Sequence, residues 1–404
     1  MSSFQPDFAQ RRFDLDWLRS GAFLLLIAYH VGMYYVTWDW HVKSPFASST
    51  IEPLMVLTSP WRMSLLFLVS GVATAFLLEK RGNARGFLGP RSVRLLVPLV
   101  FAMLVIVPPQ SYLEVVEKIQ YAGSYAEFWR LYVTGYGGFC RGDDCLIVPT
   151  WNHLWFVAYL WVYTVLLFGF ARLAPRAVAW LRAQAERRLA GLALIVAPIV
   201  YLAAARWLLA LKFGSTHALI DDWYNHTVYA AVFLLGFVLA GTRAPWAAFE
   251  RWRWHALGLA VLGWGFLCIY EGLDEVMTVS FAARRLWQVV FGMQQWVCIV
   301  AVLGFARRHW NHDNAARRYL TTAIFPVYIL HQTVIVVAAH ALQPVQLPPL
   351  LEGLLLVLGT VAICFLSYEV IRRVPWLRPL FGLALRDRSA TVRSPSPVVP
   401  AAST

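Results

Sequence analysis

The chain has 404 residues, of which 59% are hydrophobic and only 14% are charged, and its mean hydropathy is +0.57. A water-soluble fold does not hide so much apolar surface, so the composition excludes a soluble enzyme and indicates an all-α polytopic integral membrane protein. The net charge of +13 does not indicate nucleic-acid binding, because the basic residues punctuate apolar segments instead of forming a patch on a soluble face.

Apolar segments long enough to cross a bilayer follow one another along the chain. We predict about ten transmembrane helices, at residues 17–37, 54–78, 92–109, 152–171, 189–211, 227–241, 255–272, 286–306, 320–341 and 349–371. The first segment is too long for a cleaved signal peptide, so we expect it to be retained. The predicted domains are a cytoplasmic segment at 1–14, a ten-helix membrane domain at 15–373 and a disordered cytoplasmic tail at 374–404.

The positions of lysine and arginine predict the orientation. If the N-terminus is cytoplasmic, most of the 35 Lys and Arg fall in inner loops, so both termini are expected in the cytoplasm. Cys140 and Cys145 then lie in an outer loop and face an oxidising compartment. We expect a disulfide between them and predict no metal site, since neither cysteine has a histidine at ligand spacing.

His30 lies well inside the first apolar segment, where an ionisable side chain is costly and marks a functional site by default. Arg19 precedes it by about three helical turns, roughly 16 Å, so both side chains project from nearly the same helix face. We therefore expect this pair to line one cavity that runs from the membrane edge to the membrane middle.

Polar residues in the next segments each have a structural and a functional interpretation. Ser70 belongs to a face of small residues that suits close helix packing or a cavity wall. Arg62 either snorkels to the interface or, with Trp61 beside it, holds a sugar or an anion. His153 and Trp155 fit either residues at the water boundary or part of an acceptor site.

Two later motifs are similarly open. Arg91 and Arg94, three positions apart at the cytoplasmic end of the third segment, fit ordinary positive-inside charge or a phosphate-binding pair. In the ninth segment, Pro326 frees a backbone carbonyl that another group must satisfy. Tyr328 and His331 follow, and they predict either a second polar wall facing the first or a buried structural hydrogen bond.

Five short motifs follow one another in order. They are Arg19 and His30 with ten residues between them, LFLVSG at 66–71, Arg91-Ser-Val-Arg94, HLWF at 153–156 and PVYILH at 326–331. Together they resemble the acyltransferase family 3 membrane proteins over residues 13 to about 373, although Leu66 stands where the family commonly has phenylalanine. The local phrases, including PWRMSLLFLVSG, look most like the branch that substitutes periplasmic glucans with succinyl groups.

The resemblance implies an O-acyltransferase of a bacterial inner membrane, with no permanently bound cofactor. The implied co-substrate is acyl-CoA, either succinyl-CoA or acetyl-CoA, and the implied acceptor is a hydroxyl of an extracytoplasmic glucan or other carbohydrate. His30 is the expected general base. The residues expected to bind acyl-CoA are Arg19, Ser70, Arg91 and Arg94. Those expected at the acceptor or on the cavity wall are Trp61, Arg62, His153, Trp155, Tyr328 and His331.

Two other functions stay open on the residues alone. A proton-coupled small-solute transporter would use the same mid-membrane polar groups and the proline-interrupted segment. A non-catalytic partner in an envelope-assembly complex would need His30 only for structure. The asymmetric placement of the arginines, together with the reach from them to His30, favours the enzyme.

Overall fold

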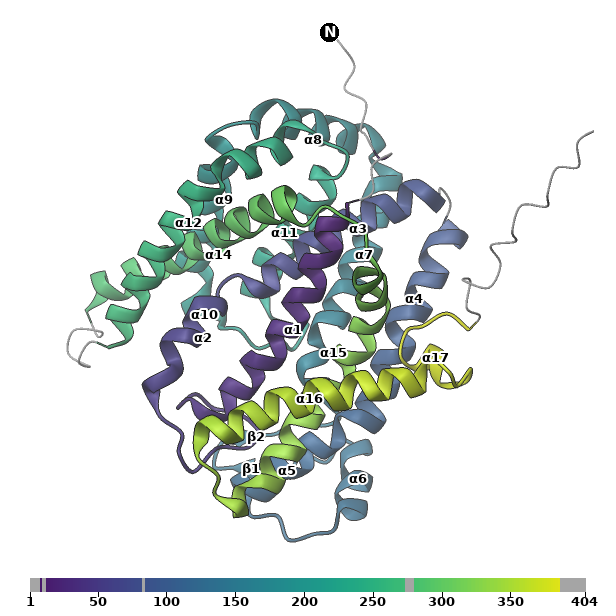
Figure 1. The fold of residues 1–404 in the computed structure, drawn as a ribbon, viewed down its shortest axis with the longest axis vertical. Helices are drawn as coiled ribbons and strands as arrows, with labels where there is room; N and C mark the ends of the chain where they lie inside the picture. The colour runs from purple at the N-terminus through teal and green to yellow at the C-terminus, as the bar shows by residue number, and fades with distance from the viewer. Residues whose placement is uncertain (1–7, 9–11, 82–83, 273–279, 386–404) are drawn as a thin grey trace, which may run out of the picture.

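The computed structural model describes residues 8, 12–81, 84–272 and 280–385, and nearly all of its regular structure is helical (Figure 1). The helices are α1 (Phe13–Tyr35), α2 (Glu52–Thr58), α3 (Arg62–Arg81), α4 (Ala84–Phe101), α5 (Pro108–Ile119), α6 (Tyr125–Val133), α7 (Trp155–Leu173), α8 (Pro175–Arg188), α9 (Ala193–Ala205), α10 (Leu211–Phe213), α11 (Trp223–Leu239), α12 (Ala244–Glu271), α14 (Phe281–His309), α15 (Ala315–Leu342), α16 (Pro349–Ile371) and α17 (Leu377–Leu380). A hairpin of β1 (Cys140–Arg141) and β2 (Asp144–Cys145) lies between α6 and α7.

Within the described ranges, eight helical segments are long and apolar enough to cross a membrane. They span Ser49–Lys80, Gly86–Ile119, Asn152–Leu173, Ala193–Phe213, Ala244–Glu271, Phe281–His309, Ala315–Val345 and Pro349–Ile371. α11 is apolar but shorter, and α1 is outside this group. The all-α, multi-pass membrane architecture predicted from the composition is therefore confirmed.

The predicted apolar segments all overlap helices, but several boundaries differ; α12, for example, begins at Ala244 and not near residue 255. The segment at 54–78 is divided, because α2 ends at Thr58 and α3 begins only after Pro60. The segment at 92–109 continues through a π-helical turn at Ala102–Ile106 into α5. The start of the expected disordered tail is ordered instead: α17 forms, and Phe381 is buried against Phe101 at 5.4 Å between ring centres. The rest of that tail, 386–404, and most of the expected N-terminal segment lie outside the described residues.

α1 lies near the middle of the bundle and packs against α3, α14, α15 and α16 (Figure 1). Beside it, α3 and α11 are in close contact because each has a glycine where the helices meet. A Cβ atom on Gly71 would lie 2.0 Å from the Phe233 carbonyl oxygen, and one on Gly236 would lie 2.1 Å from that of Leu68. The small-residue face of α3 therefore serves close helix packing at Gly71.

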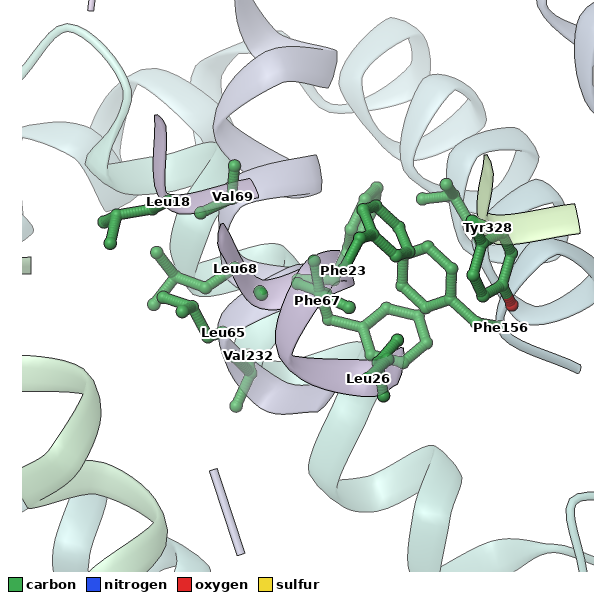
Figure 2. Close-up of a cluster of buried hydrophobic side chains, with 14 of the residues drawn as sticks. Leu18, Phe23, Leu26, Leu65, Phe67, Leu68, Val69, Phe156, Val232 and Tyr328 are labelled. Atoms are coloured by element: carbon green, nitrogen blue, oxygen red, sulfur yellow. The ribbon is translucent and has the colours of Figure 1, made fainter. Parts of the chain in front are cut away.

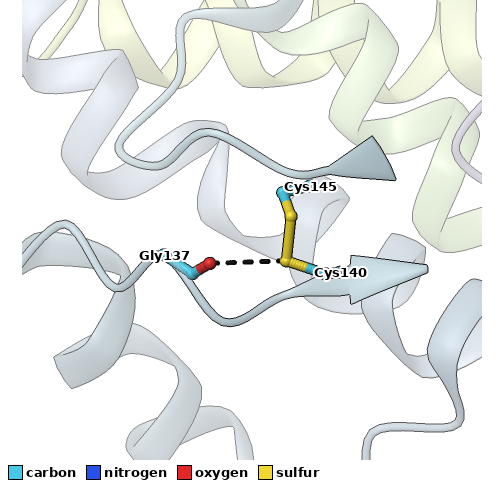
Figure 3. The surroundings of a disulfide bond; sticks show 3 residues. All are labelled: Gly137, Cys140 and Cys145. Carbon is cyan, nitrogen blue, oxygen red and sulfur yellow. Dashed lines mark hydrogen bonds between the residues drawn. A yellow bond between two sulfur atoms is a disulfide. The ribbon is translucent and has the colours of Figure 1, made fainter. Parts of the chain in front are cut away.

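The outer loop predicted to hold a disulfide is compact. Ser124 caps the start of α6 through a reciprocal pair of hydrogen bonds with Glu127, and Phe128 and Tyr132 of this helix pack into a small apolar cluster. The hairpin follows, and Cys140 and Cys145 are joined by a disulfide across it (Figure 3). This hairpin and α6 lie at the end of the molecule opposite α8 (Figure 1).

Candidate active site

His30 and His331 meet in the middle of the bundle, although 301 positions separate them in the chain. α1 carries His30 and α15 carries His331, and α15 runs unbroken through Pro326. The His30 Nδ1 and His331 Nε2 atoms are 2.8 Å apart, and the two rings are nearly parallel at 5.0 Å between centres. The two polar walls predicted from the sequence therefore touch each other at these rings.

The hydrogen-bond partners assign the protons of this pair. His331 Nδ1 lies 2.6 Å from the Tyr328 carbonyl oxygen, which only accepts, so Nδ1 carries the hydrogen. In a neutral His331, Nε2 is then unprotonated and accepts the hydrogen bond from His30 Nδ1. His30 consequently has its lone pair on Nε2, which is the tautomer that a base needs.

His153 joins this pair as a third imidazole. Its ring is edge-on to His331 at 5.0 Å between centres, and its Nε2 donates to the Ile329 carbonyl oxygen at 3.1 Å. The Tyr328 hydroxyl donates to the His153 carbonyl at 2.5 Å, which ties α15 to the start of α7. The buried His153 Nδ1 has no hydrogen-bond partner within the described residues. A second unprotonated ring nitrogen therefore lies close to the pair.

His30 and His153 line a cavity of about 820 Å³, which we call the outer cavity after the orientation predicted from the sequence. Its other walls are rich in aromatic rings, with polar groups between them. This composition suits a carbohydrate, whose faces stack on rings and whose hydroxyls hydrogen-bond to polar atoms. The aromatic lining consists of Tyr29, Trp38, Trp40, Trp151, Trp155, Tyr224, Tyr229, Trp287, Phe291 and Tyr328.

A chain of polar side chains supports one wall of the outer cavity. Gln332 donates through its amide to His41 Nε2 at 2.8 Å, and His41 Nδ1 lies 2.5 Å from Glu114. The same amide contacts Gln110 Oε1 at 3.0 Å, and Gln110 Oε1 also accepts from Asn152 at 3.0 Å. Gln332 and Asn152 are thereby held in fixed orientations where they line the cavity.

The opposite wall is organised by Asp222, which is fully buried. Burial raises the pKa of its carboxyl group, but hydrogen bonds from Tyr159, Asn225 and a loop amide outweigh burial, and the pKa is lowered. His217 stacks on Trp155 at 4.1 Å between ring centres. Burial lowers the pKa of His217 to about 4 against the raising effect of Asp222, so this ring is neutral at pH 7.

A second cavity of about 700 Å³, the inner cavity, lies between α1 and α3. Its charged lining is Arg12, Asp16, Arg19, Glu79 and Lys80. Arg19 is held there by a long contact of 3.9 Å with Asp16 and by the Thr321 carbonyl at 3.5 Å. The surplus of positive charge suits an anionic ligand.

The outer and inner cavities share no lining residue. Along α1, the buried apolar side chains Phe23 and Leu26 lie between Arg19 and His30, and we call the cluster to which they belong the apolar plug (Figure 2). Leu26 and Tyr328 reach the outer cavity from the plug, and Val69 reaches the inner one. We expected Arg19 and His30 to line one cavity, but Arg19 lines the inner cavity and His30 lines the outer cavity. The residues labelled in Figure 2 make up the plug: Leu18, Phe23, Leu26, Leu65, Phe67, Leu68, Val69, Phe156, Val232 and Tyr328.

Comparison with known proteins identifies the family. The family model described as an acyltransferase domain matches residues 12–369, which is most of the chain. The chain belongs to this acyltransferase family. It is an O-acyltransferase enzyme, and its membership decides between enzyme and carrier in favour of the enzyme.

Relatives of this acyltransferase include proteins named Glucans biosynthesis protein C, which is the branch expected from the sequence. Those of Salmonella gallinarum and Salmonella heidelberg are 24% identical over 394 residues and 26% identical over 387 residues. The one of Salmonella paratyphi B is 24% identical over 397 residues. Each alignment covers 93% of this chain and 95% of the relative. No solved structure matches the acyltransferase significantly.

The structure gathers most of the predicted acceptor-side residues. Arg62, His153, Trp155 and Tyr328 line the outer cavity, and His331 lies directly behind His30. Trp61 does not line it, because its indole N–H donates to the Leu57 carbonyl at 2.8 Å and its ring packs against the core.

The residues predicted to bind acyl-CoA do not all line one cavity. Only Arg19 lines the inner cavity, whereas Arg91, Arg94 and Ser70 are not among its lining residues. Near the two arginines, Ser92 accepts a hydrogen bond from Trp161 at 3.0 Å, which ties α4 to α7. Their role in donor binding stays a prediction.

Several cavity residues were missed by sequence reasoning. Three of them line the outer cavity. In the sequence, Arg206 lies in an apolar segment, His217 in a loop and Trp287 at the start of a predicted helix, and none of these places indicated a site. The abundance of tryptophan, 19 residues in the chain, was the one signal available. It did not distinguish a sugar-binding wall from membrane-interface anchors.

Proposed function

We propose that this acyltransferase moves a succinyl or acetyl group from cytoplasmic acyl-CoA to a hydroxyl of an extracytoplasmic glucan or other carbohydrate. The observation that carries the proposal is the chain from the Tyr328 carbonyl through His331 to His30. It leaves the His30 Nε2 lone pair unused in a residue that lines the aromatic outer cavity. A base oriented by a second residue in this way is the arrangement that activates a hydroxyl nucleophile.

In the proposed reaction, His30 Nε2 takes the proton of the acceptor hydroxyl as that oxygen attacks the thioester carbonyl. The new C–O bond forms, the C–S bond breaks, and the CoA thiolate leaves. General-base catalysis of this kind contributes about 10²- to 10⁴-fold in rate. His331 is a positioning residue, because it fixes the tautomer of His30 without lining the cavity itself.

The donor half of the proposal is supported by the inner cavity. Arg19 and Lys80 supply positive charge there for the phosphates of CoA, whereas Arg12 is already paired with Asp14 at 2.6 Å. Arg91 and Arg94 are further candidates on α4. The thioester arm then has to pass the apolar plug to reach His30, so the proposal requires α1 and α3 to part locally during turnover.

We also propose ten crossings of a bacterial inner membrane, with both termini in the cytoplasm. Eight segments meet the length and hydropathy of a span, and α1 and α11 would supply the other two. The arginine-rich α8 and the disulfide-bonded hairpin lie at opposite ends of the molecule, as this orientation requires (Figure 1). Single cysteines introduced in α8 and in α6 should be labelled by an impermeant maleimide from opposite sides; labelling from the same side would contradict the topology.

The test of the function is thiol release by the purified protein from succinyl-CoA and acetyl-CoA, with and without a soluble β-glucan. Release that depends on the glucan and disappears in His30→Ala supports the proposal. The matched control is His255→Ala, since His255 is an exposed histidine of α12 away from both cavities. Wild-type turnover in His30→Ala would exclude the base, and no release from either thioester would contradict the pairing of an acyl-CoA donor with a β-glucan acceptor.

A further inference from the structure

The outer cavity contains a buried arginine that nothing in the reaction scheme uses. Arg62, at the start of α3, is only 9% exposed and lines the cavity together with His30. Its guanidinium lies over the ring of Tyr29, the residue before His30, at 3.2 Å from the ring centre. Its Nε and Nη1 atoms are buried without a hydrogen-bond partner within the described residues. The charge is therefore stacked on a ring but has no counter-anion in the described part of the chain.

Arg206 is a second guanidinium on the same cavity. Its Nη1 donates to the Tyr224 hydroxyl at 2.8 Å, and the group stacks on Phe291 at 3.6 Å from the ring centre. Its Nε is buried and has no hydrogen-bond partner in the described part of the chain. Like Arg62, it is fixed by aromatic neighbours and leaves hydrogen-bond donors unused.

The carboxylates of the outer cavity do not neutralise these arginines. Asp39 is paired with Lys118 at 2.8 Å, and its side chain is 69% exposed. Glu271 is also exposed and accepts a hydrogen bond from the Trp287 indole at 3.2 Å. Across the described residues, no carboxylate lies within ion-pair distance of Arg62 or Arg206. The two acidic groups are thus engaged or exposed, while the buried Arg62 and the half-buried Arg206 have no carboxylate partner among the described residues.

A buried guanidinium without a counter-anion is unfavourable, because it gives up hydration and gains no ion pair in return. Stacking on an aromatic ring recovers part of that loss through the ring face. The in-plane N–H donors remain, and they match the oxygens of a carboxylate or phosphate. A neutral sugar leaves this charge uncompensated, so the cavity is matched to a ligand that is itself negatively charged.

We propose that Arg62 and Arg206 form an anion-binding subsite of the outer cavity, which takes a carboxylate or phosphate carried by the reacting molecule. The inference deepens the proposed function and rests on it for the identity of that molecule. The anion comes from one of two sources: the far end of a dicarboxylic acyl group, or a charged substituent on the acceptor glycan. In either case, Arg62 and Arg206 select the substrate and His30 performs the proton transfer.

Binding of three unreactive product analogues distinguishes the sources. They are the butyrate ester of methyl β-glucoside, which is neutral; its hemisuccinate ester, with the charge on the acyl end; and the butyrate ester of methyl β-glucuronoside, with the charge on the sugar. Affinities are measured by quenching of tryptophan fluorescence, which needs no turnover. We expect one anionic ester to bind about 10- to 100-fold more tightly than the neutral ester, and that ester names the source.

Arg62→Gln and Arg206→Gln should each reduce the ratio of the affinity for the anionic ester to that for the neutral ester toward one. Arg62→Lys should keep part of this ratio because the charge remains. Arg130→Gln on α6 is the matched control, since Arg130 is an exposed arginine away from the cavity. Equal affinity for all three esters, or a ratio that survives both glutamine variants, would overturn the subsite.

The binding assay also separates this inference from the proposed function. If the affinity ratio between anionic and neutral esters depends on Arg62 and Arg206, but the protein does not turn over acyl-CoA, the subsite is supported and acyl-CoA is excluded as the donor. If the protein turns over acyl-CoA but binds anionic and neutral esters equally well, the subsite is excluded and the proposed acyltransferase reaction is unaffected.

Discussion

Replacement of His331 tests the positioning role most directly. In His331→Leu, the His30 Nδ1–H loses its acceptor at 2.8 Å, and the Tyr328 carbonyl loses its donor at 2.6 Å. A buried polar group without its partner costs about 1 to 3 kcal/mol. If that cost falls on the orientation of His30 in the transition state, kcat decreases by about 5- to 150-fold.

His331→Gln is the informative companion to that variant. The glutamine amide oxygen accepts from His30 Nδ1 as the imidazole does, so this variant should recover most of the lost kcat while the leucine variant does not. The assay is thiol release at saturating acyl-CoA, with thermal unfolding measured in parallel to show that both variants fold. A leucine variant with wild-type kcat, or a glutamine variant slower than the leucine variant, would refute the proton assignment.

Three further outcomes are expected. Gly71→Val should destabilise the fold by about 3 kcal/mol, because its Cβ would lie 2.0 Å from the Phe233 carbonyl. Gly89→Ala, with open space around it in α4, should not lower the unfolding temperature, because alanine favours a helix over glycine. Burial lowers the pKa of His217 to about 4 from its usual 6.5, so the unfolded chain binds a proton at a higher pH than the folded chain does, and the free energy of unfolding falls as the pH drops from 6.5 to 4. His217→Gln should flatten this pH dependence in unfolding measurements. An equal slope in both proteins would contradict the lowered pKa. Arg19→Gln should raise the KM for acyl-CoA several-fold with kcat retained, and an unchanged KM would mean that the inner cavity does not hold the donor.

Hydropathy and charge predicted the helices well because each transmembrane helix is specified by its own residues. The last predicted segment, 349–371, coincides with α16. Two errors have different causes. The helix is interrupted near Pro60, a local signal that the hydropathy pattern alone does not contain. Phe381 packs against Phe101, and this tertiary contact orders a stretch whose composition resembled a free tail.

The sequence predicted individual residues of the candidate site but not the contacts between them. His30 and His331 were each marked by their depth in an apolar helix, but the contact between Nδ1 and Nε2 depends on the rotation of two helices that no local pattern encodes. Arg91 and Arg94 illustrate the opposite case. Their spacing suited phosphates, and yet the inner cavity forms between α1 and α3 and takes only Arg19 of the predicted set.

The apolar plug has an electrical consequence. If water fills both cavities, most of the voltage across the proposed membrane span drops over the short apolar layer of the plug. Each elementary charge that crosses the full drop changes in energy by about 2.3 kcal/mol per 100 mV. Under the proposed topology and donor, an acyl group bearing a carboxylate would be driven outward through the plug in a cell that is negative inside, whereas a neutral acetyl group would gain nothing from the field.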